Sequence, residues 1–274
     1  MRYLPTPEQA ARLTPEELRT HFLVSGLFVP GEVRFETVDL DRVTLGGVLP
    51  LANPITLVAP EVFATESFTE RRELGILNIG GAGTISAGDA TYPAARLDML
   101  YVGRGAPEVT LRSDDPAKPA RYFLVSYPAH AEHPTARIGA GDADAAELGT
   151  QERANRRRLA RYIHQGGVRS AQLVMGVTAL HEGSVWNTMP PHTHVRRSEI
   201  YLYFDLPADA VVFHMMGTPD ATQHLVVRDG EVALSPSWSI HAGCGTSSYT
   251  FCWAMGGENQ DFADMQGFDM TTLR

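Results

Sequence analysis

The chain has few cysteines and no long apolar run. Cys244 and Cys252 are the only cysteines among its 274 residues, too few for the disulfide framework of a small secreted domain. The opening segment, Met1–Glu8, has no apolar signal core, and no stretch approaches the length that spans a membrane. We therefore expect a protein of the reducing cytoplasm that has no membrane partner.

Concentrated positive charge is also scarce. The formal net charge is -9, and the one basic cluster is Arg156–Arg158 with Arg161 nearby. Phosphate backbones are bound by concentrated basic surfaces, so the balance argues against a nucleic-acid partner. The cluster falls in residues 151–165, which we predict to form a helix with a solvated basic face; contact with a local anion or with another subunit is the second interpretation.

The pattern of residue types along the chain predicts an all-β fold. Threonine and proline at Thr6–Pro7 and Thr14–Pro15 indicate short N-terminal helices, with Thr14 as an N-cap. From about Phe22 onward, short apolar runs alternate with Gly, Pro and Asp, which is typical of sandwiches and barrels. Strands are expected at residues 43–49, 74–80, 98–103 and 122–126, and again between residues 170 and 255.

Two short segments of the first half can be aligned with segments of the second half, and this internal echo indicates two similar halves. Residues 67–72 can be laid on 192–197, and residues 98–105 on 236–243. Residues 140–149 are small and polar and are expected to form a linker. These observations predict two β-barrels, residues 1–145 and 146–274, the first without metal ligands.

The second half carries a set of residues typical of metal sites. A β-strand points residues i and i+2 to one face, so His192 and His194 can bind one ion together. Glu199 reaches that ion if the chain turns at Val195–Ser198 and returns as a strand. With His241 downstream, three imidazoles and a carboxylate suit Zn, Fe, Mn, Ni or Cu.

The alternative to a metal site is that His192 and His194 are ordinary core or surface histidines. The presence of Glu199 and His241 at the expected spacing makes this alternative weaker. Cys244 could be a ligand or a nucleophile, but a small buried thiol is the common use of cysteine. The remaining histidines lack such neighbours and are expected to pack in the core or lie at the surface; they are His21, His130, His133, His164, His181, His214 and His224.

The spacing resembles the paired motifs of the cupin superfamily. In that pattern a glycine precedes His-x-His and a later Glu, and Gly-x5-Pro-x4-His follows, as in Gly230, Pro236 and His241. Trp238 stands where a glycine is usual. The resemblance implies a bicupin, with two jelly-roll β-barrels and a short helical N-terminus.

Several longer sequence segments are similar to those of the 5-keto-4-deoxyuronate isomerase family, and the similarity extends from Phe22 to the C-terminus. They are residues 68–84, 186–190, 192–197, 201–205, 213–217, 235–241 and 255–260. The resemblance implies one Zn²⁺ per subunit held by His192, His194, Glu199 and His241, a homohexamer, and a role in the breakdown of pectin-derived uronates. The implied reaction is aldose–ketose isomerisation to 3-deoxy-D-glycero-2,5-hexodiulosonate.

That reaction needs a Lewis acid for the developing oxyanion and a base that carries a proton between carbons. Glu199 is a candidate proton carrier if it loosens from the metal. The uronate carboxylate needs a cationic partner. Four arginines lie in the motif-bearing segments, and Arg197 and Arg72 are the candidates ahead of Arg196 and Arg71, although turn or interface salt bridges are the commoner use of such residues. Tyr201, Tyr203 and Trp253 could line the pocket, although the barrel core is the more common place for such aromatic residues.

Two other functions are compatible with the same ligands. A cupin dioxygenase would use Fe(II), which three histidines and a carboxylate also suit. A non-catalytic sugar-binding cupin is weakened by the complete ligand set and by the absence of a basic DNA-binding segment.

Overall fold

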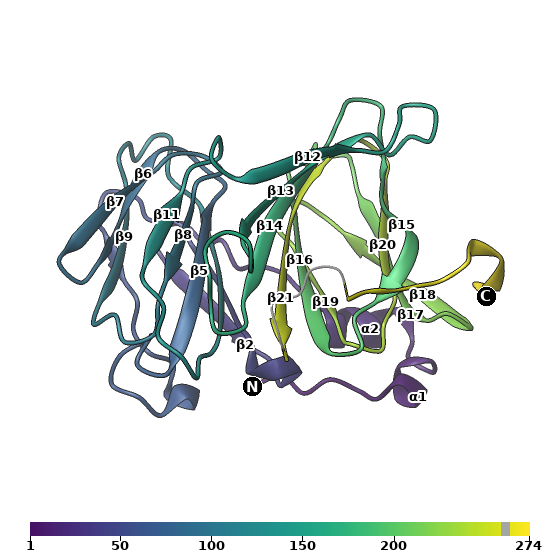
Figure 1. Ribbon diagram of the computed structural model, residues 1–274, viewed down its shortest axis with the longest axis horizontal. Helices are drawn as coiled ribbons and strands as arrows, with labels where there is room; N and C mark the ends of the chain where they lie inside the picture. Colours follow the sequence, from purple (N-terminus) through teal and green to yellow (C-terminus); the bar gives the residue numbers. More distant parts are fainter. Residues whose placement is uncertain (259–263) are drawn as a thin grey trace. The chain divides into compact units, whose positions relative to one another are not determined.

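The computed structural model describes residues 1–258 and 264–274, and strands form most of its regular secondary structure (Figure 1). The α-helices in this part of the chain are α1 (Pro7–Ala10) and α2 (Pro15–Phe22). Thr6 and Thr14 cap them, each accepting a hydrogen bond from the third helical N–H, with proline at the helix start. The predicted all-β class and the N-cap at Thr14 are confirmed. No helix in the described ranges is long and apolar enough to cross a membrane.

The chain folds into two compact units that interleave in sequence. Unit 1 contains Met1, Gly26–Asp144 and Tyr162–Val174, and unit 2 contains Arg2–Ser25, Ala145–Arg161 and Met175–Arg274. The sequence predicts a single boundary between residues 145 and 146, so the prediction does not contain this interleaving. The difference arises because strand β1 (Leu23–Val24) pairs with β19 (Val232–Ser235), which keeps the N-terminal helices in unit 2.

Unit 1 contains two antiparallel sheets. The six-stranded sheet has the order β11-β8-β5-β10-β3-β2, and the four-stranded sheet has the order β4-β9-β6-β7. Their bounds are β2 (Val33–Thr37), β3 (Thr44–Val48), β4 (Ile55–Thr56), β5 (Arg72–Asn78), β6 (Gly83–Ala87), β7 (Ala90–Ala94), β8 (Met99–Val102), β9 (Val109–Ser113), β10 (Tyr122–Pro128) and β11 (Ala136–Ile138). Short 3-10 turns lie at η1 (Leu40–Arg42) and η2 (Glu61–Phe63). The predicted strands of this half are confirmed.

Unit 2 repeats the arrangement. Its sheets have the orders β1-β19-β16-β21-β14-β13-β12 and β18-β17-β20-β15-β22. The further bounds are β12 (Asp144–Leu148), β13 (Arg157–Ile163), β14 (Val174–Leu180), β15 (Trp186–Thr193), β16 (Arg197–Phe204), β17 (Val212–Thr218), β18 (Ala221–Val227), β20 (His241–Gly245), β21 (Thr250–Gly257), β22 (Gln266–Gly267) and the 3-10 turn η3 (Met270–Thr272). Helix α2 packs against β18 and β19 (Figure 1).

The repeated topology tests the internal echo. Strands β5 and β16 hold the same place in their sheets and begin at Arg72 and Arg197, as the first echo predicts. The second echo is out of register. Val102 pairs with the third residue of β5, and Ser235 pairs with the third residue of β16. Val102 therefore corresponds to Ser235 in the two units. It follows that Gly103 does not correspond to His241.

Two local predictions are wrong. Residues 151–165 do not form a helix: residues 151–154 turn, Ala154 has a positive φ of 51°, and β13 follows. The residues of β13 join the large sheet of unit 2, and such pairing overrides local helix propensity. The expected linker at 140–149 contains β12, the edge strand of the same sheet.

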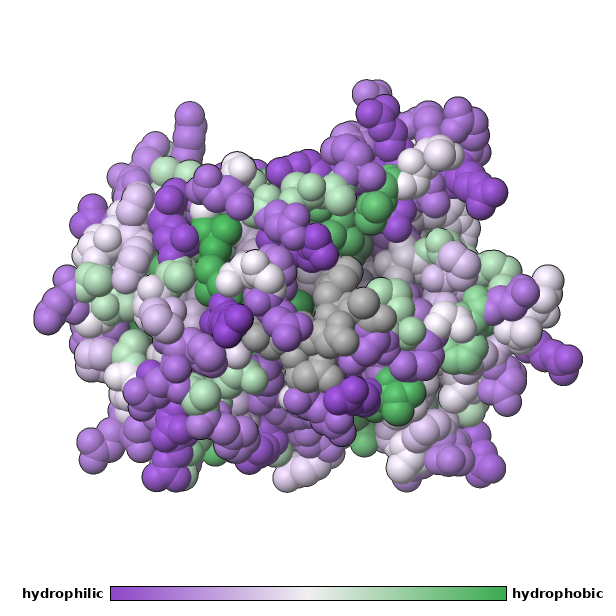
Figure 2. All heavy atoms as spheres, viewed as in Figure 1, coloured by the Kyte–Doolittle hydropathy of each residue, from purple (hydrophilic) through white to green (hydrophobic). Residues whose placement is uncertain are grey.

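Polar residues cover most of the face drawn in Figure 2, and hydrophobic residues appear there as small separate patches. The apolar side chains instead fill the interiors of the units, as in the unit 1 cluster that includes Leu74, Ile76, Leu111 and Leu124, each at most 1% exposed. This distribution is that of a globular protein whose strands bury one or both faces.

Candidate metal centre and its cavity

Paired strands set His192 and His241 opposite each other. His192 lies near the end of β15, and its partner across the antiparallel ladder is His241, the first residue of β20. His194 follows two residues after His192, and the chain then turns at Val195 and Arg196. It returns as β16, which carries Glu199. The predicted turn and returning strand are confirmed, and the turn is tighter than expected.

The side chains of these four residues converge on one point. The Nε2 atom of His192 lies 3.1 Å from that of His194 and 3.0 Å from that of His241. The Oε2 atom of Glu199 lies 3.1 Å from His194 Nε2 and 3.0 Å from His241 Nε2. Among the described residues this is the one group of His, Cys, Asp and Glu side chains able to hold a metal ion, and all its ligand atoms lie within 4.8 Å of one another.

This donor set fits a divalent metal. Zn–N bonds of about 2.0–2.1 Å in a tetrahedron imply edges of roughly 3.3 Å, close to the four short distances here. His194, Glu199 and His241 are at most 4% exposed, so the ion would be held largely out of water. Three imidazoles and a carboxylate could therefore hold a metal ion.

Neighbouring groups act on two of the imidazole rings. Ser235 Oγ lies 3.1 Å from His241 Nδ1, and Asp264 Oδ1 lies 3.8 Å from His194 Nδ1. A histidine that binds metal through Nε2 carries its proton on Nδ1, so Ser235 Oγ would accept a hydrogen bond from His241, whereas Asp264 is too far from His194 for a hydrogen bond and acts on that ring through its charge. Asp264 also forms an ion pair with Arg197, whose Nη2 is 3.3 Å from His194 Nδ1. In the metal-binding tautomer both Arg197 Nη2 and His194 Nδ1 carry protons, so that last contact is not a hydrogen bond, and the Asp264 carboxylate offsets the charge of Arg197 beside the ring.

The electrostatics favour the metal-binding forms of His192 and Glu199. Burial, with the charge of His241 adding, lowers the pKa of His192 to about 3. Burial alone would raise the pKa of Glu199, but the charge and hydrogen bonds of His241 and His194 hold that pKa well below its usual value. A neutral imidazole and an ionised carboxylate at neutral pH are what metal binding requires.

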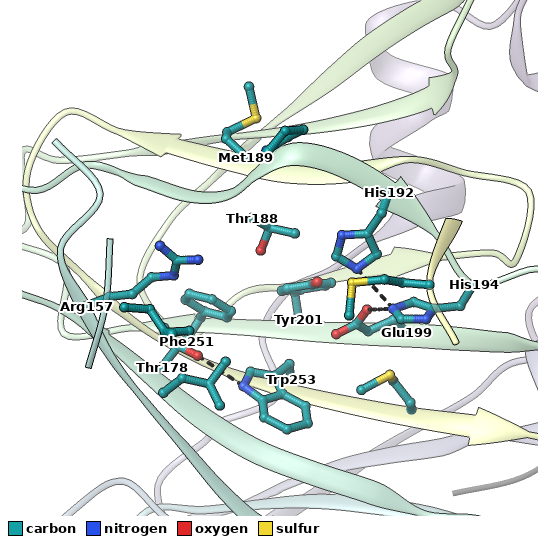
Figure 3. A pocket seen from close by; sticks show the side chains of 15 residues that line it. Arg157, Thr178, Thr188, Met189, His192, His194, Glu199, Tyr201, Phe251 and Trp253 are labelled. Carbon is teal, nitrogen blue, oxygen red and sulfur yellow. Dashed lines mark hydrogen bonds and ion pairs between the residues drawn. The ribbon is translucent and has the colours of Figure 1, made fainter. Parts of the chain in front are cut away.

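The four-residue centre opens onto a cavity of about 250 Å³ (Figure 3). Its walls are mainly apolar, and its polar lining residues beyond the centre include Arg157, Thr178, Thr188 and Tyr201. Trp253 also lines the cavity, and its Nε1 donates a hydrogen bond of 3.1 Å to Thr178 Oγ1. The volume is near the lower end of ligand pockets, roughly 300–1,000 Å³, and suits a small ligand.

For several lining residues the sequence favoured another place. The barrel core was the favoured place for Tyr201 and Trp253 and the pocket wall was the alternative; both side chains line the cavity. Arg157 was predicted to lie on a solvated helix face, and the structure instead places it at the start of strand β13 on the cavity wall. Asp264 carried no signal, because only the fold brings it beside His194.

The structure places neither predicted substrate arginine on the cavity. Arg197 is 1% exposed and is committed to Asp264. Arg72 belongs to unit 1, where its guanidinium donates to Ser126 Oγ at 3.1 Å and lies over the Phe63 ring. Arg196 pairs with Glu258 at the surface.

Other predicted residues fall outside the centre. Cys244 is partly buried, and burial raises the pKa of its thiol, which disfavours a reactive thiolate. His214 is buried in β17, where its Nδ1 lies 2.8 Å from the Tyr203 hydroxyl. Trp238, in the turn before His241, packs edge-on against Phe22 of α2. In the motif at residues 255–260, Asn259 and Gln260 lie outside the described residues.

His214 gives a pH-dependent stability that can be measured. Burial, with the charge of His241 adding, lowers its pKa to about 3, whereas a histidine in an unfolded chain titrates near 6.5. Between these values the unfolded chain binds a proton that the native protein does not, so stability falls as the pH falls below 6.5. We expect His214→Asn to reduce this slope by up to about 1.4 kcal/mol per pH unit.

Urea unfolding of the chelated protein between pH 6.5 and 4.5 measures the slope, and the exposed His130→Asn is its control. Equal slopes for His214→Asn and the unsubstituted protein would contradict the assignment of a neutral buried His214.

Comparison with known proteins places the chain in one family. The model of the KduI/IolB family matches residues 31–270. A 4-deoxy-L-threo-5-hexosulose-uronate ketol-isomerase of Kineococcus radiotolerans is 51% identical over 276 residues, covering 100% of this chain and 99% of that protein. The protein of that name from Opitutus terrae is 50% identical over 275 residues, with the same coverage.

Solved structures show the same fold at low identity. An IolB-like protein from Salmonella typhimurium superposes with a TM-score of 0.75 at 14% identity, covering 90% of this chain and 96% of that one. An oxalate decarboxylase from Lactobacillus farciminis superposes with a TM-score of 0.60 at 10% identity, covering 89% of each chain. The family-model match over most of the chain and the full-length identities show that the chain belongs to the KduI/IolB family.

Proposed function

We propose that the protein is a metal-dependent ketol isomerase that converts 5-keto-4-deoxyuronate to 3-deoxy-D-glycero-2,5-hexodiulosonate, in the catabolism of pectin-derived uronates. Relatives that carry this isomerase name are 43–51% identical over the full length of the chain. The observation that carries the proposal is the convergence of four metal-ligating atoms at one end of a small cavity in such a chain.

We propose that His192, His194, Glu199 and His241 hold one Zn²⁺ per chain. The ion would supply Lewis-acid polarisation of the substrate oxygens, which requires no change of redox state. The donor atoms and their spacing support this assignment, and Ser235 would fix the orientation of the His241 ring.

The residues around the centre supply the rest of the chemistry. Glu199 carries the only carboxylate among the described residues that line the cavity, so it is the candidate that moves a proton between the two reacting carbons. Burial, reinforced by the charge of Glu199, raises the pKa of Tyr201 well above its usual value. Its hydroxyl therefore stays protonated and can donate a hydrogen bond to a substrate oxygen, while the apolar walls exclude water.

Three further properties belong to the same proposal. We expect a homohexamer that works in the cytoplasm, as the family resemblance implies. The roles of Arg197 and Arg72 in substrate binding stay predictions, and the ion pair of Arg197 and the hydrogen bonds of Arg72 weigh against them.

The direct test is to incubate the purified, metal-replete protein with 5-keto-4-deoxyuronate and follow the reaction by NMR. We expect the signal of the C1 aldehyde or its hydrate to disappear and a hydroxymethyl signal to appear, with no oxygen uptake. Failure to form the 2,5-diketo acid would refute the proposal. Oxygen consumption would instead support the Fe(II) dioxygenase, and binding without turnover would support the sugar-binding protein.

A further inference from the structure

Arg157 is a cation on the cavity wall that has no role in the metal centre. It begins strand β13, and its side chain lines the cavity. Figure 3 shows it at the opposite end from His192, His194 and Glu199, with Thr188 and Tyr201 between. The cavity therefore has a metal-ligating end and a cationic end.

No carboxylate among the described residues neutralises this guanidinium. Its Nη1 donates a hydrogen bond of 2.9 Å to the backbone carbonyl of Asn155, and no ion pair accompanies that bond. Arg197 and Arg137, by contrast, are paired with Asp264 and Asp98. A partly buried charge that lacks a counter-ion is costly, and an anionic ligand would remove that cost.

The surroundings of Arg157 favour an anion. Leu148, Leu159 and Phe251 line the same cavity and reduce access of water, which strengthens attraction between opposite charges. Burial already lowers the pKa of Arg157, although the group remains a cation at neutral pH. A guanidinium can grip a carboxylate with two parallel hydrogen bonds.

We propose that Arg157 binds the carboxylate of the substrate and so selects uronates and fixes their orientation. The inference rests on the proposed function for the identity of the ligand. In 5-keto-4-deoxyuronate the carboxylate and the aldehyde lie at opposite ends of a six-carbon chain. With the carboxylate on Arg157, the aldehyde and its neighbouring hydroxyl carbon face the metal centre. The reverse orientation would leave the guanidinium without a partner.

The test combines a change in the protein with a change in the ligand. Arg157→Met keeps a side chain about as long as the aliphatic stem of arginine and removes the charged guanidinium, and Arg157→Lys keeps the charge without the planar guanidinium. Arg158→Met is the matched control, because neighbouring residues of a strand point to opposite faces and Arg158 does not line the cavity. The ligands are 5-keto-4-deoxyuronate and its methyl ester, in which the carboxylate is masked.

Binding to the metal-loaded protein is measured through the change in intrinsic tryptophan fluorescence, to which Trp253 of the cavity wall contributes, and turnover is measured by NMR. For Arg157→Met we expect about a 30-fold or greater loss of uronate affinity, seen as a raised KM with kcat much less affected. Arg157→Lys should recover part of the loss, and Arg158→Met should behave as the unsubstituted protein. The unsubstituted protein should bind the ester as weakly as Arg157→Met binds the uronate.

The outcomes separate this inference from the proposed function. Carboxylate-dependent binding without isomerisation would refute the isomerase and uphold the role of Arg157. Three results would overturn the role of Arg157, whether or not isomerisation occurs. The unsubstituted protein would bind the uronate and the ester with equal affinity, it would bind neither of them, or the Arg157→Met protein would bind the uronate normally.

Discussion

His241→Ala is expected to empty the metal centre and to lower kcat/KM by at least about 1,000-fold, since the metal's contribution to catalysis is several kcal/mol and each 1.36 kcal/mol is a factor of ten. His241 contacts both His192 and Glu199 through its Nε2 at 3.0 Å, so its removal opens two sides of the donor set. Metal analysis of the purified variant should show far less than one ion per chain.

The matched control is His224→Ala, which removes an exposed histidine from β18 in the same unit. It should keep its metal and its activity. A His241→Ala protein that loses its metal but still isomerises the uronate at the normal rate would contradict the catalytic role of the centre.

The second large effect concerns stability. Glu73 is fully buried in unit 1, and its carboxylate accepts hydrogen bonds from four donors. Oε1 accepts from the backbone N–H groups of Gln172 and Leu173 at 2.9 and 2.8 Å. Oε2 accepts from the N–H of Ala171 at 2.7 Å and from the hydroxyl of Tyr101 at 2.9 Å. Through these hydrogen bonds the Glu73 carboxylate holds residues 171–173 against strand β5.

We expect Glu73→Gln to destabilise the protein by about 3 kcal/mol or more, because an amide nitrogen must then face donors and leave buried N–H or O–H groups unsatisfied. A loss of that size lowers the melting temperature by roughly 6–12 °C for a domain of this size. Differential scanning calorimetry measures it, with the exposed Glu61→Gln as control. Equal melting temperatures for both variants would show that the Glu73 hydrogen bonds contribute little.

The metal-ligating set could be predicted because its information is local. The alternation of His192 and His194, the polar turn and the strand that carries Glu199 are properties of one hairpin, and strand geometry alone directs them to one face. His241 is distant in sequence, but its spacing from Gly230 and Pro236 marks it, and Gly230 has a positive φ of 78° as a turn glycine does.

The cationic end of the cavity could not be predicted in the same way. Three successive arginines at residues 156–158 suit a solvated helix, and only pairing within the large sheet of unit 2 makes Arg157 and Arg158 part of a strand, with Arg157 lining the cavity. Asp264 is likewise far in sequence from His194 and Arg197, and no spacing rule joins them. The interleaving of the units depends on β1 adding to β19, a pairing of two residues that leaves no periodic signal.

The most direct measurement is a titration of Zn²⁺ into protein stripped by a chelator, with bound metal and uronate isomerisation recorded together. The account predicts that activity rises in proportion to bound metal, reaches its maximum at one ion per chain, and does not rise for His241→Ala. Full isomerase activity in stripped protein, or activity that saturates well before the four-residue centre is filled, would contradict it.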